Sequence, residues 1–183
     1  TITSGSYGFY YIGYGNGTND RESGTVIRNN ITTNAYYTGV FLQSQDSVKL
    51  TGNDIRTNSI RLNYRGIYLQ YCYNGSEVSK NYIYSLHGGY GIYSYESDGT
   101  ETSGNLIANN IIHIAGTGTE AYGLRFEYTD YANIYHNTVN IVNTVSYSRA
   151  LYVYSGTNLR ILNNIFVNTG GGYGSYIETT DAI

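Results

Sequence analysis

The chain has 183 residues, a length that allows one domain with a sizeable hydrophobic core. Ten basic and thirteen acidic residues give a net charge of −3, so the chain does not have the basic surface that nucleic-acid binding requires. It contains no run of about eighteen apolar residues, which excludes a membrane-spanning helix. The abundance of Tyr (24) and Gly (23) and the absence of Pro are typical of short strands joined by turns.

Two short motifs alternate along the chain. The first reads apolar-x-x-Asn-x-apolar and begins at Val26, Leu50, Val78, Leu106 and Ile134, with a further copy near the C-terminus. Its asparagines are spaced by 24, 28, 28, 28 and 26 residues, which indicates a repeat array. They are Asn29, Asn53, Asn81, Asn109, Asn137 and Asn163, and in the last copy Asn164 fits the pattern equally well.

The second motif has four positions: a small residue, an apolar residue, an aromatic residue and then usually another apolar residue. Its copies begin at Gly8, Gly39, Gly66, Gly91, Gly123, Ala150 and Gly174. Each repeat therefore holds two or three short strands and no segment with helical periodicity, and strands of stacked repeats would lie about 4.8 Å apart. The sequence predicts an all-β solenoid of about seven coils that forms a single domain over residues 1–183, with no evident capping segment.

These motifs resemble the repeats of the right-handed parallel β-helix proteins in the pectin-lyase-like superfamily, over about residues 5–180. The resemblance implies that the repeat asparagines stack inside the coil and hydrogen-bond to the turn backbone. An asparagine side chain carries both a donor and an acceptor, so we expect the six asparagines of the first motif to form a structural ladder. This fold occurs in lyases, hydrolases, adhesins and passive stalks, so the resemblance leaves the function open.

Side chains of the second motif should alternate between core and solvent because it is a strand. The apolar first and third positions would then face inward, and the second position would form an exposed aromatic column. That column is Tyr10, Phe41, Tyr68, Tyr93, Arg125, Tyr152 and Tyr176, with Tyr95, Tyr154, Glu127 and Glu178 in the column beside it. Such a face either stabilises the sheet or binds a ligand such as a polysaccharide. The candidate ligand-binding residues are Tyr68, Tyr93, Tyr95, Tyr152, Tyr154 and Tyr176.

Charged groups that could support catalysis are few. Arg125 and Glu127 interrupt the aromatic columns, and coil spacing places Glu178 about 9.6 Å from Glu127, near the upper limit for an inverting carboxylate pair. A solvated ion pair is the simpler interpretation, so a catalytic site is not expected. The three histidines are scattered and the acidic residues form few clusters, so we expect no metal site and no cofactor. Cys72 is the single cysteine, so no intrachain disulfide is expected.

The terminal repeats match the coil motif as closely as the central ones do. We therefore expect coils to continue at both ends, either by end-to-end stacking of copies or into flanking parts of a longer chain. The sequence favours a non-enzymatic extracellular or cell-surface module with a structural or adhesive role. The alternatives are a polysaccharide lyase or glycoside hydrolase, and a glycan-binding module. Sequons at Asn16, Asn30 and Asn74 are candidate glycosylation sites.

Overall fold

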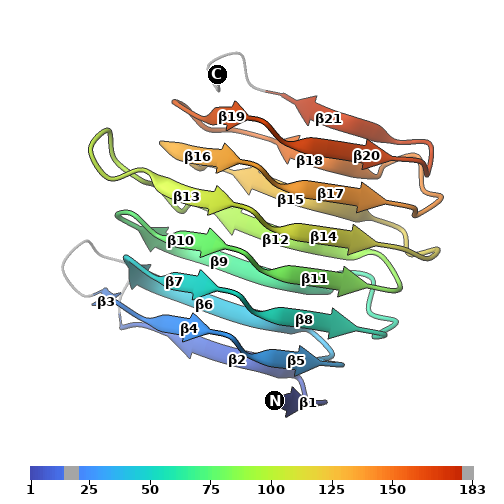
Figure 1. Ribbon diagram of the computed structural model, residues 1–183, viewed down its shortest axis with the longest axis horizontal. Coiled ribbons are helices and arrows are strands. Elements are labelled where there is room, and N and C mark those ends of the chain that lie inside the picture. Colours follow the sequence, from blue (N-terminus) through green and yellow to red (C-terminus); the bar gives the residue numbers. More distant parts are fainter. Residues whose placement is uncertain (15–20, 179–183) are drawn as a thin grey trace.

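The computed structural model describes residues 1–14 and 21–178, which form a solenoid of parallel strands (Figure 1). Three parallel sheets extend along the solenoid, and the chain adds one strand to each sheet in every full turn. In Figure 1, two of the sheets form the near layer and the third sheet forms the far layer. No helix long and apolar enough to cross a membrane is found within the described ranges.

The three sheets contain the following strands. Sheet A contains β1 (Ile2–Thr3), β5 (Ile31–Thr33), β8 (Asp54–Thr57), β11 (Tyr82–Ser85), β14 (Ile111–Ile114), β17 (Thr138–Ile141) and β20 (Ile165–Asn168). Sheet B contains β2 (Tyr7–Ile12), β6 (Thr38–Asp46), β9 (Arg65–Tyr73), β12 (Gly89–Tyr95), β15 (Ala121–Glu127), β18 (Arg149–Val153) and β21 (Tyr173–Ile177), with β3 (Glu22–Ser23) paired to β6. Sheet C contains β4 (Val26–Arg28), β7 (Lys49–Thr51), β10 (Glu77–Ser79), β13 (Asn105–Ala108), β16 (Ala132–Tyr135) and β19 (Arg160–Leu162).

The solenoid has about six turns rather than the expected seven. All seven copies of the second motif form strands of sheet B, as predicted. Sheet C has six strands within the described residues, because the first and last coils contribute to sheet B without a complete circuit of the axis.

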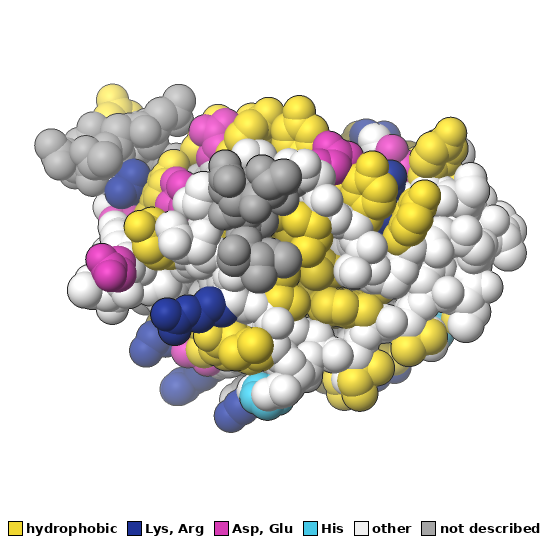
Figure 2. Space-filling model, turned by 90° about the horizontal axis from the view of Figure 1, so that it is seen from above, with side chains coloured by type: hydrophobic (Ala, Val, Ile, Leu, Met, Phe, Trp, Pro, Cys, Tyr) yellow, Lys and Arg dark blue, Asp and Glu magenta, His cyan; other side chains and the backbone are white. Residues whose placement is uncertain are grey.

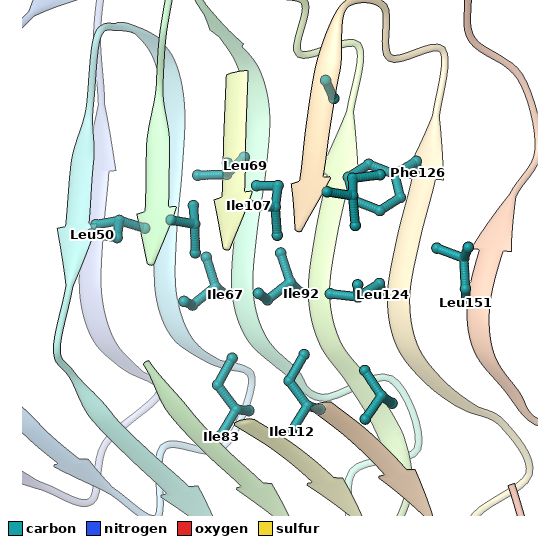
Figure 3. Packing of buried hydrophobic residues seen from close by; sticks show 14 of the residues in the cluster. Leu50, Ile67, Leu69, Ile83, Ile92, Ile107, Ile112, Leu124, Phe126 and Leu151 are labelled. Atoms are coloured by element: carbon teal, nitrogen blue, oxygen red, sulfur yellow. The ribbon is translucent and has the colours of Figure 1, made fainter. Parts of the chain in front are cut away.

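The core lies inside the coil and consists of aliphatic columns contributed by all three sheets (Figure 3). Ile67, Ile92, Leu124 and Leu151 are in register on adjacent strands of sheet B, and each is at most 1% exposed. These are residues that alternation predicted to face inward, and that prediction is confirmed. Full burial of each such side chain contributes roughly 1.5–3 kcal/mol to folding.

Glycines at the start of the second motif allow sheets A and B to pack closely. A Cβ atom on Gly91 would lie 2.5 Å from Ile112 Cγ2 on β14 and 2.5 Å from the carbonyl oxygen of Gly123 in the next coil. Real atoms do not approach so closely, so any larger residue would force the two sheets apart. The small residue that begins the motif is therefore a packing requirement of the coil.

An asparagine ladder crosses the turn between sheets C and A. In its central part, the backbone N–H and side-chain Nδ2 of Asn81 both donate to Oδ1 of Asn110, at 3.0 Å each. Asn81 Nδ2 also donates to the carbonyl oxygen of Leu50 in the preceding coil, at 2.9 Å. The same pattern links Asn30, Asn53, Asn81, Asn110, Asn137 and Asn164, so these buried turns have hydrogen-bond partners in both directions.

The ladder confirms the predicted roles of Asn53, Asn81 and Asn137 and corrects three others. Asn29, Asn109 and Asn163 precede the ladder residue and adopt left-handed backbone conformations, with φ of 54°, 56° and 56°. The equivalent positions in the other coils, Gly52, Lys80 and His136, also have positive φ. Asparagine tolerates this conformation better than most residues, so each Asn-Asn pair uses its first member for the turn and its second for the ladder.

Two of the candidate glycosylation sites lie in turns of the coil, Asn30 between sheets C and A and Asn74 between sheets B and C. Asn30 is the first member of the ladder, and Asn74 Nδ2 donates to Asp46 Oδ2 at 2.9 Å. The candidate site at Asn16 lies outside the described residues.

We predict that Asn110→Leu destabilises the fold while Asn109→Gly does not. The first change leaves the backbone N–H of Asn81 and the carbonyl oxygen of Val78 without a partner, which should cost about 1–3 kcal/mol per buried group. The second keeps a residue that adopts positive φ readily. Urea unfolding of both variants measures the difference, and equal free energies of unfolding would contradict the ladder assignment.

Candidate functional site

The outer face of sheet B carries two columns of large side chains. The first column contains Tyr7, Arg65, Tyr90, Tyr122, Arg149 and Tyr173. The second contains Tyr10, Phe41, Tyr68, Tyr93, Arg125, Tyr152 and Tyr176. We call these columns together the tyrosine–arginine layer. Its members lie outside the aliphatic core, so the predicted outward orientation of the second column is confirmed.

The predicted exposure of this column is wrong for its central residues. Phe41, Tyr93 and Tyr152 are each only 8% exposed. Tyr68 and Tyr93 stack with ring centroids 4.8 Å apart, and the Arg125 guanidinium lies 5.2 Å from the centre of the Tyr93 ring. Rings and guanidinium groups therefore cover one another, which gives the sheet a second packed layer instead of an open aromatic surface.

Carboxylates close the rim of the layer. Tyr93 Oη donates to Glu127 Oε2 at 2.6 Å, and Arg125 Nε donates to Glu127 Oε1 at 2.7 Å. Glu178 accepts a hydrogen bond from Tyr152 Oη at 3.0 Å. Figure 2 views the solenoid from the C-terminal end and shows hydrophobic and acidic side chains together along its upper edge. The structure thus pairs Arg125 with Glu127, and it engages Glu127 and Glu178 with separate tyrosines.

These contacts change the titration of the tyrosines. Burial is the main cause that raises the pKa of Tyr93 above its ordinary value, and the hydrogen bond to the Glu127 carboxylate raises it further. Burial likewise raises the pKa of Tyr90 and Tyr152, with added contributions from Glu120 and Glu178 respectively. The layer therefore requires neutral phenols.

An open groove lies beside this layer, at the corner where the chain passes from sheet B to sheet C. Its volume is about 670 Å³, and we call it the corner groove. It is lined by Tyr73, Tyr95, Glu96, Asp98, Tyr128, Asp130, Ser155, Gly156 and Thr157. These residues come from the ends of β9 and β12 and from the segments that follow β12, β15 and β18.

Local backbone geometry explains why these side chains meet. Tyr71, Glu96 and Tyr128 have φ of 56°, 44° and 51°, which turns the chain sharply at the same corner in three successive coils. The turn ends the alternation of the strand and directs the following residues along the corner. Residues from successive coils consequently lie side by side, although they are about thirty positions apart in the sequence.

Tyrosines form one wall of the corner groove. Tyr95 and Tyr128 meet edge to face, with centroids 5.9 Å apart and an interplanar angle of 86°. Tyr128 meets Tyr154 in the same way at 5.5 Å, and these two rings are 46% and 41% exposed. In contrast to the tyrosine–arginine layer, these rings have no guanidinium stacked on them among the described contacts, and Tyr128 and Tyr154 keep part of their surface exposed.

Three carboxylates line the rest of the corner groove. Asp130 Oδ1 accepts from the backbone N–H of Thr157 at 2.6 Å, and Asp98 Oδ1 accepts from the backbone N–H of Asp130 at 2.8 Å. Burial, followed by the negative charges of Asp130 and Glu96, raises the pKa of Asp98. A hydrogen bond to the Glu96 carboxylate is the largest cause that raises the pKa of Tyr95 to about 12. The groove thus concentrates negative charge next to aromatic rings.

Other reactive groups do not join this site. Across the residues that the structure describes, no cluster of three or more His, Cys, Asp and Glu side chains could hold a metal ion. Cys72 is buried in the core, and burial raises the pKa of its thiol to about 12, which keeps it protonated at neutral pH.

The sequence analysis identified part of the corner groove. Tyr95 is in the groove and Tyr154 contacts its wall, whereas Tyr68, Tyr93, Tyr152 and Tyr176 belong to the tyrosine–arginine layer. The groove residues Tyr73, Glu96, Asp98, Tyr128 and Asp130 were missed. A signal was present in the sequence, because aromatic and acidic residues recur together directly after the second motif, as in Tyr95-Glu96 and Tyr128-Thr-Asp130.

The family model described as a right handed beta helix region matches residues 12–183. The chain therefore belongs to the right-handed β-helix family, in agreement with the parallel solenoid of its structure. No curated protein and no solved structure matches the chain.

The raised tyrosine pKa values predict a loss of stability in alkali. In the unfolded chain these phenols ionise near pH 10, whereas the folded layer keeps them neutral. Their contribution to stability is therefore fully present below about pH 10 and falls as the pH rises above it. Chemical unfolding from neutral pH to about pH 11 should show this decline.

A pair of variants tests the cause of this decline. Tyr93→Phe should make it shallower because the residue can no longer ionise, and Tyr147→Phe, at a 66% exposed position, should leave it unchanged. Identical pH dependence in wild type and Tyr93→Phe would count against a neutral buried Tyr93.

Proposed function

We propose that this protein is a non-catalytic saccharide-binding module whose corner groove holds a segment of a polysaccharide. The observation that carries this proposal is an open groove of about 670 Å³ with exposed tyrosine rings on one side and carboxylates on the other. Aromatic faces pack against the C–H surfaces of pyranose rings, and carboxylates accept hydrogen bonds from sugar hydroxyls. Ligand sites commonly combine apolar walls with a few polar groups in this way.

The tyrosine–arginine layer has a different role in this proposal. Its central rings are covered, so it offers little area to a ligand. Its stacked rings and cation–π contacts instead stiffen sheet B, whose strands end at the corner groove. A rigid scaffold lowers the entropy that a binding site loses when it takes up a ligand.

Cleavage of a polysaccharide is the alternative function. Glu127 and Glu178 are already hydrogen-bonded to tyrosine hydroxyls, which makes them poor candidates for an acid and a base. The best candidate for a general acid is Asp98, because its pKa is raised and it lines the open groove. Release of new reducing ends or unsaturated products would favour an enzyme over a binding module.

The groove can be tested with one matched pair of variants. Tyr128→Ala removes a wall of the corner groove, whereas Tyr147→Ala removes a more exposed ring elsewhere. Affinity electrophoresis in gels that contain neutral, amino-sugar or uronate polysaccharides measures how far each variant is retarded. Retardation should fall in Tyr128→Ala by the equivalent of about 1 kcal/mol or more and stay unchanged in Tyr147→Ala. Absence of retardation by every polysaccharide would contradict the proposed function.

The same proposal places the module at the cell surface or outside the cell, where polysaccharides are found. Only 13% of the residues are charged, and Asn, Thr, Ser and Tyr supply much of the polar surface. This composition supports an adhesive or structural setting without specifying it.

End-to-end packing of copies is a second candidate role. Phe166, Ile161 and Ile177 contact the core at the C-terminal edge but stay partly exposed. Their neighbours one coil below, Val139, Ile134 and Val153, are 0% exposed. A further coil on this edge would bury the first three residues, and Figure 2 shows hydrophobic side chains across this end. A second copy of the chain could supply that coil.

Sedimentation of the 183-residue chain tests this role. If copies stack, the sedimentation coefficient should rise with concentration, and Ile177→Lys at the edge should suppress the rise. Val142→Lys, on the side of the solenoid and 38% exposed in the wild type, should leave the association unchanged. A wild-type chain that stays monomeric at every concentration would exclude end-to-end packing.

A further inference from the structure

The corner groove has an unbalanced charge. Glu96, Asp98 and Asp130 line it, and no Lys or Arg is among its lining residues within the described part of the chain. Arg21 pairs with Asp46 at 2.7 Å and covers the Tyr73 ring, and Arg160 lines a separate hollow of about 400 Å³. A ligand in the groove therefore meets uncompensated negative charge.

This charge distinguishes between classes of saccharide. A uronate polymer would bring carboxylates close to Glu96, Asp98 and Asp130, where like charges repel one another. A protonated amine at the same place would be attracted. A neutral sugar would gain hydrogen bonds but no charge interaction.

The aromatic wall of the corner groove also favours a cationic ligand. Ammonium groups bind to the faces of tyrosine rings, and the rings of Tyr128 and Tyr154 are open to solvent. Asp98 adds to the effect, because burial and the nearby charges of Asp130 and Glu96 raise its pKa. A cation in the groove would relieve that repulsion and hold Asp98 ionised.

From this arrangement we infer that the corner groove selects a cationic saccharide, a polymer of amino sugars with free amines, over neutral and uronate polysaccharides. The inference rests on the proposed saccharide-binding function and adds the chemical class of the ligand. Carboxylates pair with the amines, and the tyrosine rings contact the sugar faces and the ammonium groups.

Calorimetric titration with four oligosaccharides of equal length tests the inference. The ligands are a glucosamine oligomer, its N-acetylated counterpart, a glucose oligomer and a galacturonate oligomer, at low salt and at a pH where the amine is protonated. The glucosamine oligomer should bind most tightly, by about tenfold or more over the glucose oligomer, which corresponds to about 1.4 kcal/mol. Its affinity should fall as salt is added, because the charges are near the surface.

A charge-neutral variant links the selectivity to the groove. Glu96→Gln keeps the shape of the side chain and should weaken binding of the glucosamine oligomer by about tenfold, with little effect on the glucose oligomer. Glu101→Gln, in the separate hollow, removes the same charge from the chain and should change neither. A circular dichroism melt of each variant establishes that it is folded.

The outcomes separate the inference from the proposed function. Equal or tighter binding of the glucose or galacturonate oligomer would overturn the inference and leave saccharide binding intact. An equal loss of affinity for the glucosamine oligomer in Glu96→Gln and Glu101→Gln would also overturn the inference, because the attraction would then arise from net charge alone. Failure of all four oligomers to bind would overturn both.

Discussion

The axial register of the coils is the constraint on which the rest of the structure depends. The four inner ladder asparagines, Asn53, Asn81, Asn110 and Asn137, each bond to the coil before and the coil after, as Asn81 does with Leu50 and Asn110. A one-residue slip in any coil would break these bonds and would also turn the inward residues of that coil toward solvent. The ladder and the aliphatic columns therefore enforce the same alignment, and every outward side chain stacks on its equivalent in the next coil.

This alignment stacks equivalent charged side chains on one another, and the tyrosine–arginine layer and the corner groove differ in how these charges are balanced. Stacked coils bring equivalent side chains to about 5 Å, so a column of like charges would be repulsive. In the tyrosine–arginine layer, Arg65, Arg125 and Arg149 lie against aromatic rings, and Arg125 is also paired with Glu127 at the rim. In the corner groove, Glu96, Asp98 and Asp130 line one site, and no Lys or Arg is among its lining residues within the described part of the chain. Carboxylates that repel one another without contributing to packing are a feature expected of a binding site.

The sequence predicted the periodic parts of the fold, because alternation and repeat length depend on local rules. It misassigned Asn29, Asn109 and Asn163, since an Asn-Asn pair offers two residues with the same hydrogen-bonding groups. The choice depends on backbone φ, and the Gly52 and Lys80 positions in other coils would have indicated it. Alternation also placed Tyr93 on the outer face, but its burial depends on Tyr68 from one adjacent coil and on Arg125 and Glu127 from the other. The corner groove lies where alternation ends, so strand periodicity gave no information about it.

The contrast between Glu127 and Glu96 connects the fold to the proposed function. Glu127 lies on β15 with its charge balanced by Arg125 and its oxygens engaged by two donors, so it contributes to packing. Glu96 begins the turn after β12 and raises the pKa of the neighbouring Tyr95 at the wall of the groove. A residue on the strand is held by neighbours in the coils beside it, whereas a residue in the turn projects beyond them. The solenoid thus uses its strands to build a rigid body and its turns to present acidic and aromatic groups to a ligand.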